Sequence, residues 1–351
     1  MKDSYQKIVA AIEKKADALC PESLALIGVY GSCATGDVHP KSDLDLLILI
    51  KDEKGRCLAD AFILDDVDIG FDLYCTTWDM LERDAECHHS RLAKLLDVKL
   101  LCIKDPLAAE RLKALQDQAM SVLASPQRFA RAFAAWEKAK VAYADVCLSD
   151  TISQVRIHTA ESLDYGFDAL MLYHGRYFSG GTKRMLEELA TIGFSFDIKA
   201  MTEAVIKGET SQDICNALGM WMRTVSDVLK TTATPQMLPC RDNLSGTYEE
   251  MFSNWRNKMW EAANRGDQFS SFANLASLAF MLEDIANGVA IRKTDVMRDY
   301  SPRDLYRNAQ SFDDVLEKYL AEYARAGIEP RRFADAQTFL KAYTAYEETP
   351  M

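Results

Sequence analysis

The sequence predicts an α/β unit at residues 1–124 followed by an all-helical region at residues 125–351. Short apolar runs rich in branched residues, typical of buried strands, occur in the first part of the chain. Beyond Pro106 no such run follows, and Ala, Leu, Glu, Lys and Met dominate long stretches with a helical period. The length of 351 residues also favours two domains over one.

A helix opens the predicted α/β unit, because Ile8, Ile12 and Leu19 recur at helical spacing before Pro21 ends the pattern. Four apolar runs then predict strands, at residues 24–31, 44–50, 67–75 and 98–103. Helical segments lie between and around these runs, which is the pattern of an α/β unit.

Ser125 and Pro126 mark the predicted boundary, since proline restricts the residue before it and commonly begins a helix. After it, helices are expected at residues 127–148, 152–174, 182–192, 197–206, 210–230, 247–264, 269–287 and 311–325, and residues 107–123 form the helix that precedes it. Residues 231–247, with two prolines, are the longest irregular stretch. This stretch is a connector or a lid, and the connector is favoured.

The charge balance limits the partners of the protein. Its 53 acidic and 41 basic side chains give a net charge of -12, which repels the phosphate backbone of long nucleic acids. A small cationic molecule is a more favourable partner. A nucleoside triphosphate would need a metal ion and a few local cations to enter so acidic a protein.

The nine cysteines form no C-x-x-C pair, and their number is odd. Reduced thiols in a cytoplasmic protein are therefore expected, with neither a disulfide framework nor a zinc site. No stretch approaches the roughly 18 apolar residues of a membrane span, so no membrane partner is expected. His88 and His89 point in different directions as neighbours, so a surface helix is favoured over a metal site there.

The segment at residues 29–50 carries the chemistry. Asp43 and Asp45 are two residues apart as the chain enters an apolar strand, so both carboxylates face the same side. Two carboxylates held close repel each other unless a cation lies between them. Magnesium fits, because it prefers hard oxygen ligands and is commonly held by carboxylates together with substrate phosphates.

A Gly-Ser pair precedes these aspartates. Gly31 lets the backbone come close to a phosphate, and the amides that follow can donate to it together with the Ser32 hydroxyl at a helix start. Ser42 offers a further hydroxyl donor or caps the turn. The segment therefore predicts an anion site facing a metal site.

These residues resemble the signature of the DNA polymerase beta type nucleotidyltransferase superfamily, in which Gly-Ser is followed by Asp-x-Asp. Gly31, Ser32, Asp43 and Asp45 match it without departure. The resemblance implies a small mixed sheet flanked by helices over residues 1–124. It also implies a third carboxylate on a later strand. Asp72 is the first candidate, and Asp68 is the alternative on the same face of a continuous strand.

The resemblance implies a reaction as well. An acceptor hydroxyl attacks the α-phosphorus of a nucleoside triphosphate, ATP as the expected donor of AMP, and pyrophosphate leaves. Two magnesium ions held by Asp43, Asp45 and Asp72 would stabilise the attacking and departing oxygens. The acceptor is expected to be a small cationic molecule. The alternatives are nucleotidylation of a protein or an RNA end, and a nucleotide-binding module without activity.

The succession of a compact α/β domain and a helical domain resembles two-domain enzymes such as the aminoglycoside adenylyltransferases. Residues 173–189 resemble a segment of such helical domains in which a glycine-bearing loop leads to a basic residue. Lys183 and Arg184 are therefore expected to reach the triphosphate, the alternative being two solvated cations. The candidates for a general base, besides Asp72, are the three carboxylates Glu161, Asp164 and Glu187.

Overall fold

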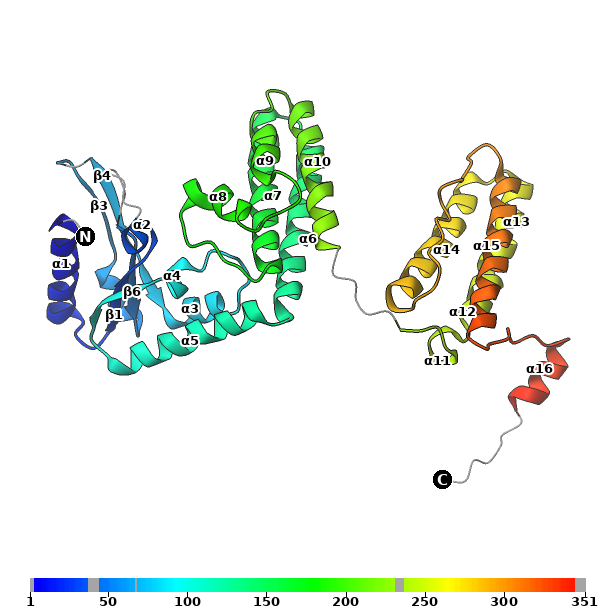
Figure 1. The fold of residues 1–351 in the computed structure, drawn as a ribbon, viewed down its shortest axis with the longest axis horizontal. Helices are drawn as coiled ribbons and strands as arrows, with labels where there is room; N and C mark the ends of the chain where they lie inside the picture. The colour runs from blue at the N-terminus through cyan, green and yellow to red at the C-terminus, as the bar shows by residue number, and fades with distance from the viewer. Residues whose placement is uncertain (1–2, 37–43, 67, 231–236, 345–351) are drawn as a thin grey trace, which may run out of the picture. The chain divides into compact units, whose positions relative to one another are not determined.

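The computed structural model describes residues 3–36, 44–66, 68–230 and 237–344. The chain divides into two compact units, Met1–Thr231 and Thr232–Met351. A small mixed sheet with helices is followed by a largely helical region, which confirms the predicted fold class (Figure 1). None of the helices in the described ranges is long and apolar enough to cross a membrane.

The first unit begins with an α/β part, whose elements are α1 (Asp3–Leu19), β1 (Leu24–Val29), α2 (Gly31–Thr35), β2 (Leu46–Ile50), the 3₁₀ helix η1 (Glu53–Leu58), β3 (Asp60–Leu64), β4 (Ile69–Leu73), β5 (Cys75–Thr77), α3 (Trp78–Ala85), α4 (Ala93–Leu96), β6 (Lys99–Ile103) and α5 (Pro106–Ala124). It continues with α6 (Gln127–Leu148), α7 (Ile152–Tyr173), the 3₁₀ helix η2 (Thr182–Arg184), α8 (Met185–Ala190), α9 (Ile198–Ile206) and α10 (Ser211–Leu229).

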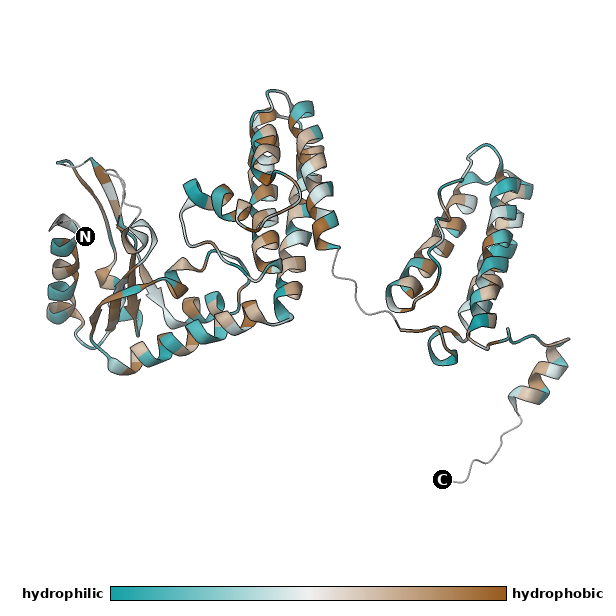
Figure 2. Cartoon of the chain, in the orientation of Figure 1, coloured by the Kyte–Doolittle hydropathy of each residue, from teal (hydrophilic) through white to brown (hydrophobic). Residues whose placement is uncertain are grey.

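The central sheet has the strand order β5-β2-β1-β6. Strand β1 is antiparallel to β2 and β6, whereas β2 is parallel to β5, so the sheet is mixed as predicted. All five residues of β2 are buried, because Leu46, Ile48 and Ile50 face one core and Leu47 and Leu49 face the other. Figure 2 shows the brown of hydrophobic residues over much of this sheet.

The two faces of the sheet are covered differently. Helix α1, η1 and strand β4 pack on one face. Helices α3, α4 and α5 pack on the other, and their core continues without a break into α6, α7, α8, α9 and α10. This shared core explains why the first compact unit extends to residue 231. The predicted domain boundary after residue 124 falls at the break between α5 and α6 and stays a prediction.

The predicted continuous strand at residues 67–75 is wrong. Strand β4 pairs with β3 in a separate two-stranded sheet, whereas β5 pairs with β2 in the central one. Asp68 lies in the turn before β4 with a φ of 51°, so it does not share a strand face with Asp72. The stacked rings of Phe62 and Phe71, 5.3 Å apart, fix the register of the β3–β4 hairpin.

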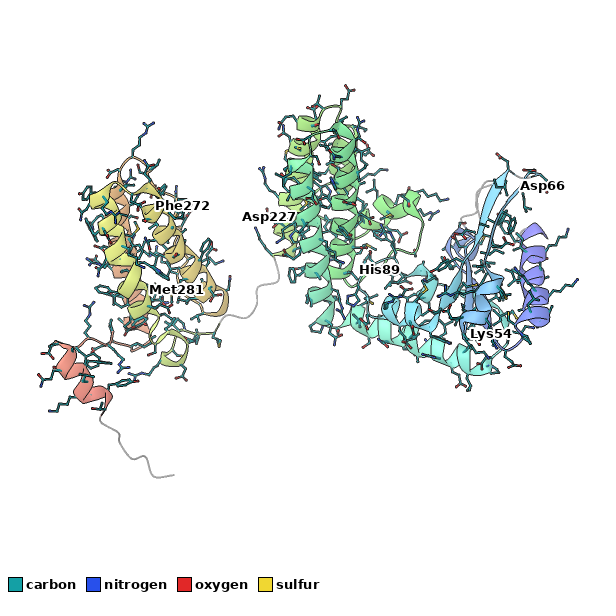
Figure 3. All side chains as sticks on the ribbon, turned by 180° about the vertical axis from the view of Figure 1, so that it is seen from behind. Lys54, Asp66, His89, Asp227, Phe272 and Met281 are labelled. Carbon is teal, nitrogen blue, oxygen red and sulfur yellow. The ribbon has the colours of Figure 1, made fainter. Side chains whose placement is uncertain are left out.

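The second unit contains α11 (Arg241–Leu244), α12 (Thr247–Met251), the π-helix η3 (Phe252–Arg256), α13 (Asn257–Arg265), α14 (Gln268–Gly288), α15 (Leu305–Arg325) and α16 (Ala336–Tyr343). Its own core lies mainly among α13, α14 and α15. Figure 3 labels Phe272 and Met281 on α14. Of the predicted irregular stretch at 231–247, residues 231–236 lie outside the described residues, and Met237 forms an isolated bridge with Val289. The prediction is wrong for residues 241–244, which form α11.

Candidate functional site

The Gly-Ser turn lies directly against Asp45. The ladder between β1 and β2 ends at the pair of Val29 and Leu46, and one more bond follows, in which the Tyr30 amide donates to the Asp45 carbonyl over 3.1 Å. Gly31 has a φ of +61°, and a β-carbon built on it would lie 2.2 Å from Asp45 Oδ2. Only glycine therefore fits at this position. The Asp45 carboxylate rests on the Gly31 backbone.

Helix α2 starts at Gly31 and is tied at its far end. The Thr35 hydroxyl donates to the Gly31 carbonyl over 3.2 Å, and the Gly36 amide donates to the Ser32 carbonyl over 3.0 Å. Lys99 in β6 donates its ammonium to the Ala34 carbonyl. A cation at the carboxyl end of a helix stabilises its dipole, so Lys99 holds α2 in place. Sequence analysis did not identify Lys99.

The aspartates of the signature are only partly within the described residues. Asp45 is half-buried and directly precedes β2. Asp43 and Ser42 lie outside the described residues, so their roles stay predictions. Where the structure describes the chain, no three His, Cys, Asp or Glu side chains are grouped as a metal site. This finding does not test the predicted magnesium site, because one of its ligands, Asp43, lies outside the described residues.

Asp72 lies on the outward side of the β3–β4 hairpin. Ile69, Phe71 and Leu73 of the same strand are buried, and Asp72 between them is exposed opposite Ala61. An exposed carboxylate on a strand edge is accessible to a metal ion and a substrate. Its assignment as the third carboxylate stays a prediction.

A pocket of about 360 Å³, which we call the Tyr30 pocket, opens at the residue before Gly31. It is lined by Tyr30, Asp84, His89, Arg91, Ala93, Lys94, Phe178, Gly180, Gly181, Thr182 and Met185. The signature end of β1 and the Gly-Gly-Thr turn before α8 thus share one pocket. Lys183 and Arg184 directly follow this turn in η2 and are exposed, but they do not line the pocket.

Two basic side chains of the Tyr30 pocket, His89 and Arg91, come from the turn after α3, and another, Lys94, comes from α4. Asp84 holds two of them, with 3.3 Å from Oδ1 to His89 Nε2 and 3.1 Å from Oδ2 to Lys94 Nζ. Burial raises the pKa of the Asp84 carboxyl, but its contacts with His89 and Lys94 outweigh burial and hold the pKa below its usual value. Arg91 is the third basic residue.

The surface helix predicted for His88 and His89 is wrong. Helix α3 ends at Ala85, and Cys87 adopts a φ of 55°, which breaks the helix before the two histidines. Figure 3 labels His89 beside the helical bundle. The four basic residues between positions 88 and 94, in the sequence HHSRLAK, were the signal that sequence analysis missed.

A second pocket, of about 330 Å³, shares His89 and Arg91 with the first. We call it the Tyr165 pocket, and it is lined by His88, His89, Arg91, Ala135, Lys138, Asp164, Tyr165 and Asp168. The wall between the pockets is fixed by Ser90, which is fully buried. The Ser90 amide donates to Asp168 over 3.0 Å, its hydroxyl donates to the same carboxylate, and its carbonyl accepts from Phe178 over 2.8 Å.

The three candidate bases differ in their surroundings. Asp164 lines the Tyr165 pocket and pairs with Arg91. Glu161 instead contacts His158, 3.0 Å from carboxylate oxygen to Nδ1, and lines neither pocket. Glu187 is exposed on α8 and also lines neither.

Comparison with known proteins assigns the first part of the chain. Residues 12–113 match the nucleotidyltransferase domain family. This part of the chain is therefore similar to nucleotidyltransferase domains. The matched range contains Gly31, Asp45 and Asp72, whereas Lys183 and Arg184 lie outside it.

The chain is also similar to a solved structure. It is described as a nucleotidyltransferase-like protein from Exiguobacterium sibiricum 255-15, and it shares 13% identity with this chain. The match covers 70% of this chain and 79% of that one, with a TM-score of 0.35. No curated protein sequence matches this chain.

Proposed function

We propose that the protein transfers AMP from ATP to a hydroxyl group of a small acceptor and releases pyrophosphate. The observation that carries this proposal is the placement of the Asp45 carboxylate on the Gly31 backbone within the part of the chain that matches the nucleotidyltransferase domain family. A carboxylate and a phosphate-binding turn in contact are the two parts that nucleotidyl transfer requires, because the metal bound by one neutralises the phosphate held by the other.

The residues present fit magnesium. Asp45 offers hard carboxylate oxygens beside the Gly31 backbone, so close that a β-carbon at position 31 would lie 2.2 Å from Oδ2. Asp43 and Asp72 are the proposed further ligands. When bound, magnesium neutralises charge on the transferred phosphoryl group and lowers the cost of forming the attacking oxygen.

We assign the phosphates to the Gly-Ser turn and the basic side chains of the Tyr30 pocket. The Ser32 hydroxyl and nearby amides serve as donors at the signature end of β1. Arg91 and Lys94, which line the same pocket as Tyr30 and Gly181, supply positive charge. An acidic protein repels a triphosphate unless positive charge lies near the binding site, and these two cations supply that charge. Lys183 and Arg184, which follow the same turn, are proposed to add to it.

The Tyr165 pocket is the proposed acceptor site, because it shares a wall with the Tyr30 pocket. Of the three candidate bases, Asp164 is the one that lines it, so we assign Asp164 as the group that receives the hydroxyl proton. The pocket carries both signs of charge, with Arg91 and Lys138 against Asp164 and Asp168. Because the pocket does not favour either sign of charge, the proposal that the acceptor is cationic rests on the net charge of the whole chain, -12.

In the proposed reaction, the acceptor oxygen forms a bond to the α-phosphorus while the bond from this phosphorus to the bridging oxygen breaks. The hydroxyl proton passes to Asp164, and pyrophosphate leaves with the bridging oxygen. Arg91 and Lys94 then face the charge that develops on pyrophosphate.

The test is a pyrophosphate-release assay with ATP and magnesium against a panel of amine-rich small molecules and a cell extract. We expect release with at least one acceptor, its loss with a chelator, and its loss in the Asp45→Asn variant. Asparagine keeps the shape of aspartate but not its charge, so the variant is expected to fold normally. An unchanged melting temperature (Tm) would show that a loss of activity is not caused by unfolding. Near wild-type turnover by Asp45→Asn would overturn the metal assignment.

A further inference from the structure

Two cysteine thiols lie in contact at the end of the β1–β2 pair that is remote from the signature. Cys20 Sγ and Cys57 Sγ are 3.5 Å apart although 37 positions separate the residues in sequence. Cys20 follows α1 and is buried, whereas Cys57 lies in η1 and is exposed. One thiol of the pair is therefore shielded from solvent, and the other is accessible to it.

The segments that carry the two thiols are tightly fixed. The Ser23 amide donates to the Cys20 carbonyl over 3.0 Å, and the Lys51 amide donates to the Ser23 carbonyl over 2.8 Å. Asp52 caps η1 by accepting from the amides of Lys54 and Gly55. A β-carbon on Gly55 would lie 2.6 Å from Ile50 Cγ2, so η1 packs closely on β2. The short sulfur–sulfur distance is thus set by the backbone on both sides.

A third thiol nearby is directed elsewhere. Cys75 is buried and donates its thiol to the Gly55 carbonyl, 3.6 Å away. Burial raises the pKa of Cys20 to about 11, so that buried thiol stays protonated at neutral pH. Cys57 is therefore the thiol of this pair that meets an oxidant first.

The sheet register shows where a crosslink would act. Leu24 lies opposite Ile50 at one end of the β1–β2 pair, and Val29 lies opposite Leu46 at the other. Cys20 and Cys57 flank the first end, while Gly31 and Asp45 flank the second. At about 3.3 Å per residue, five residues of strand put the two ends roughly 16 Å apart.

We infer that Cys20 and Cys57 form a reversible disulfide when the protein meets a peroxide. The Cys57 thiolate attacks a peroxide oxygen and becomes a sulfenic acid, releasing water once protonated. The Cys20 sulfur then attacks Cys57 Sγ, and hydroxide leaves with the Cys20 proton as a second water. Two thiols and one hydrogen peroxide thus give one disulfide and two waters, and a dithiol reductant reverses the change.

The crosslink closes the chain between residues 20 and 57, which includes the whole Gly-Ser and Asp-x-Asp signature. Such a loop restricts the unfolded chain, so the oxidised protein is expected to be more stable than the reduced one. Because the crosslink lies at the opposite end of the strands from Gly31, nucleotide binding is expected to continue.

The experiment treats the full chain with hydrogen peroxide, blocks the remaining thiols and digests at acidic residues without reduction. This digestion separates Cys20 from Cys33 and Cys57 from Cys75. We expect mass spectrometry to recover a peptide pair joined through Cys20 and Cys57, which dithiothreitol removes. The Tm should rise on oxidation by about 5 °C.

The matched variants are Cys57→Ser and Cys240→Ser, both of which replace an exposed thiol. Cys57→Ser should lose the joined peptides and the rise in Tm, whereas Cys240→Ser should keep both. Recovery of Cys57 as a blocked thiol after peroxide treatment, or joined to Cys75, would overturn the inference.

Discussion

Gly31 and Asp45 are in contact across the ends of β1 and β2, with no room for a side chain at position 31. A β-carbon there would lie 2.2 Å from Asp45 Oδ2 and 3.0 Å from its carboxyl carbon. The backbone amide of Tyr30 and the carbonyl of Asp45 are bonded beside this contact. The phosphate turn and the metal carboxylate are therefore positioned by the same pair of strands.

This contact predicts that Gly31→Ala abolishes pyrophosphate release, because the methyl group displaces the Asp45 carboxylate. The matched control is Gly36→Ala, since Gly36 also has a positive φ, +83°, but no atom within 4 Å of an added β-carbon. Both variants bear the cost of alanine at positive φ, roughly 1–2 kcal/mol. We expect similar losses in Tm but a rate loss of orders of magnitude for Gly31→Ala alone, and equal rates would refute the role of the contact.

Asp72 and Asp68 are distinguished by a pair of asparagine variants. Asp72→Asn should reduce the rate by orders of magnitude, because it removes a proposed metal ligand from the exposed face of β4. Asp68→Asn should cost less than about tenfold, or roughly 1.4 kcal/mol of barrier. Asparagine tolerates the positive φ of Asp68, so the turn is preserved. Single-turnover rates measure both, and the reverse order would exchange the roles.

The double variant Lys183→Ala with Arg184→Ala should raise the KM for ATP several-fold and leave the Tm nearly unchanged. Both residues are exposed and directly follow the turn that lines the Tyr30 pocket. Lys207→Ala is the control, because Lys207 is an exposed cation directly after α9, outside both pockets. If the double variant and the control have the same KM, Lys183 and Arg184 are ordinary surface cations.

The lowered pKa of Asp84 predicts that this residue contributes to the stability of the folded protein in a pH-dependent way. Its pKa is lowered in the folded protein, so its contribution is fully present above the unfolded value of about 3.9 and is lost as the pH falls through the folded value. Asp84→Asn should therefore lower the Tm by several degrees at pH 7 and by much less near pH 3. Asp79→Asn, at an exposed position of the same helix, is the control. A difference in Tm that does not change with pH would contradict the charge interaction with Lys94.

The sequence alone determined the elements that depend on local pattern. The branched apolar run at residues 46–50 indicated a strand buried on both faces, and the structure confirms it. Most of the helices after Pro126 follow from their period, although α15 begins at Leu305, earlier than predicted, and α11 and α16 were not predicted. The Gly-Ser and Asp-x-Asp residues carried the resemblance to nucleotidyltransferases, and residues 12–113 match the nucleotidyltransferase domain family.

The tertiary structure decided what depends on distant partners. An apolar run cannot show which strand it will pair with, so the division of residues 67–75 between two sheets was not predictable. The Tyr30 pocket joins residue 30 to residues 84–94 and 178–185, and no local pattern links these segments. Only the structure points to the roles proposed for His89, Arg91 and Lys94. The buried Ser90 is hydrogen-bonded to Asp168, and this bond positions the segment that carries the three basic residues. A long-range hydrogen bond of this kind leaves no periodic signal in a sequence.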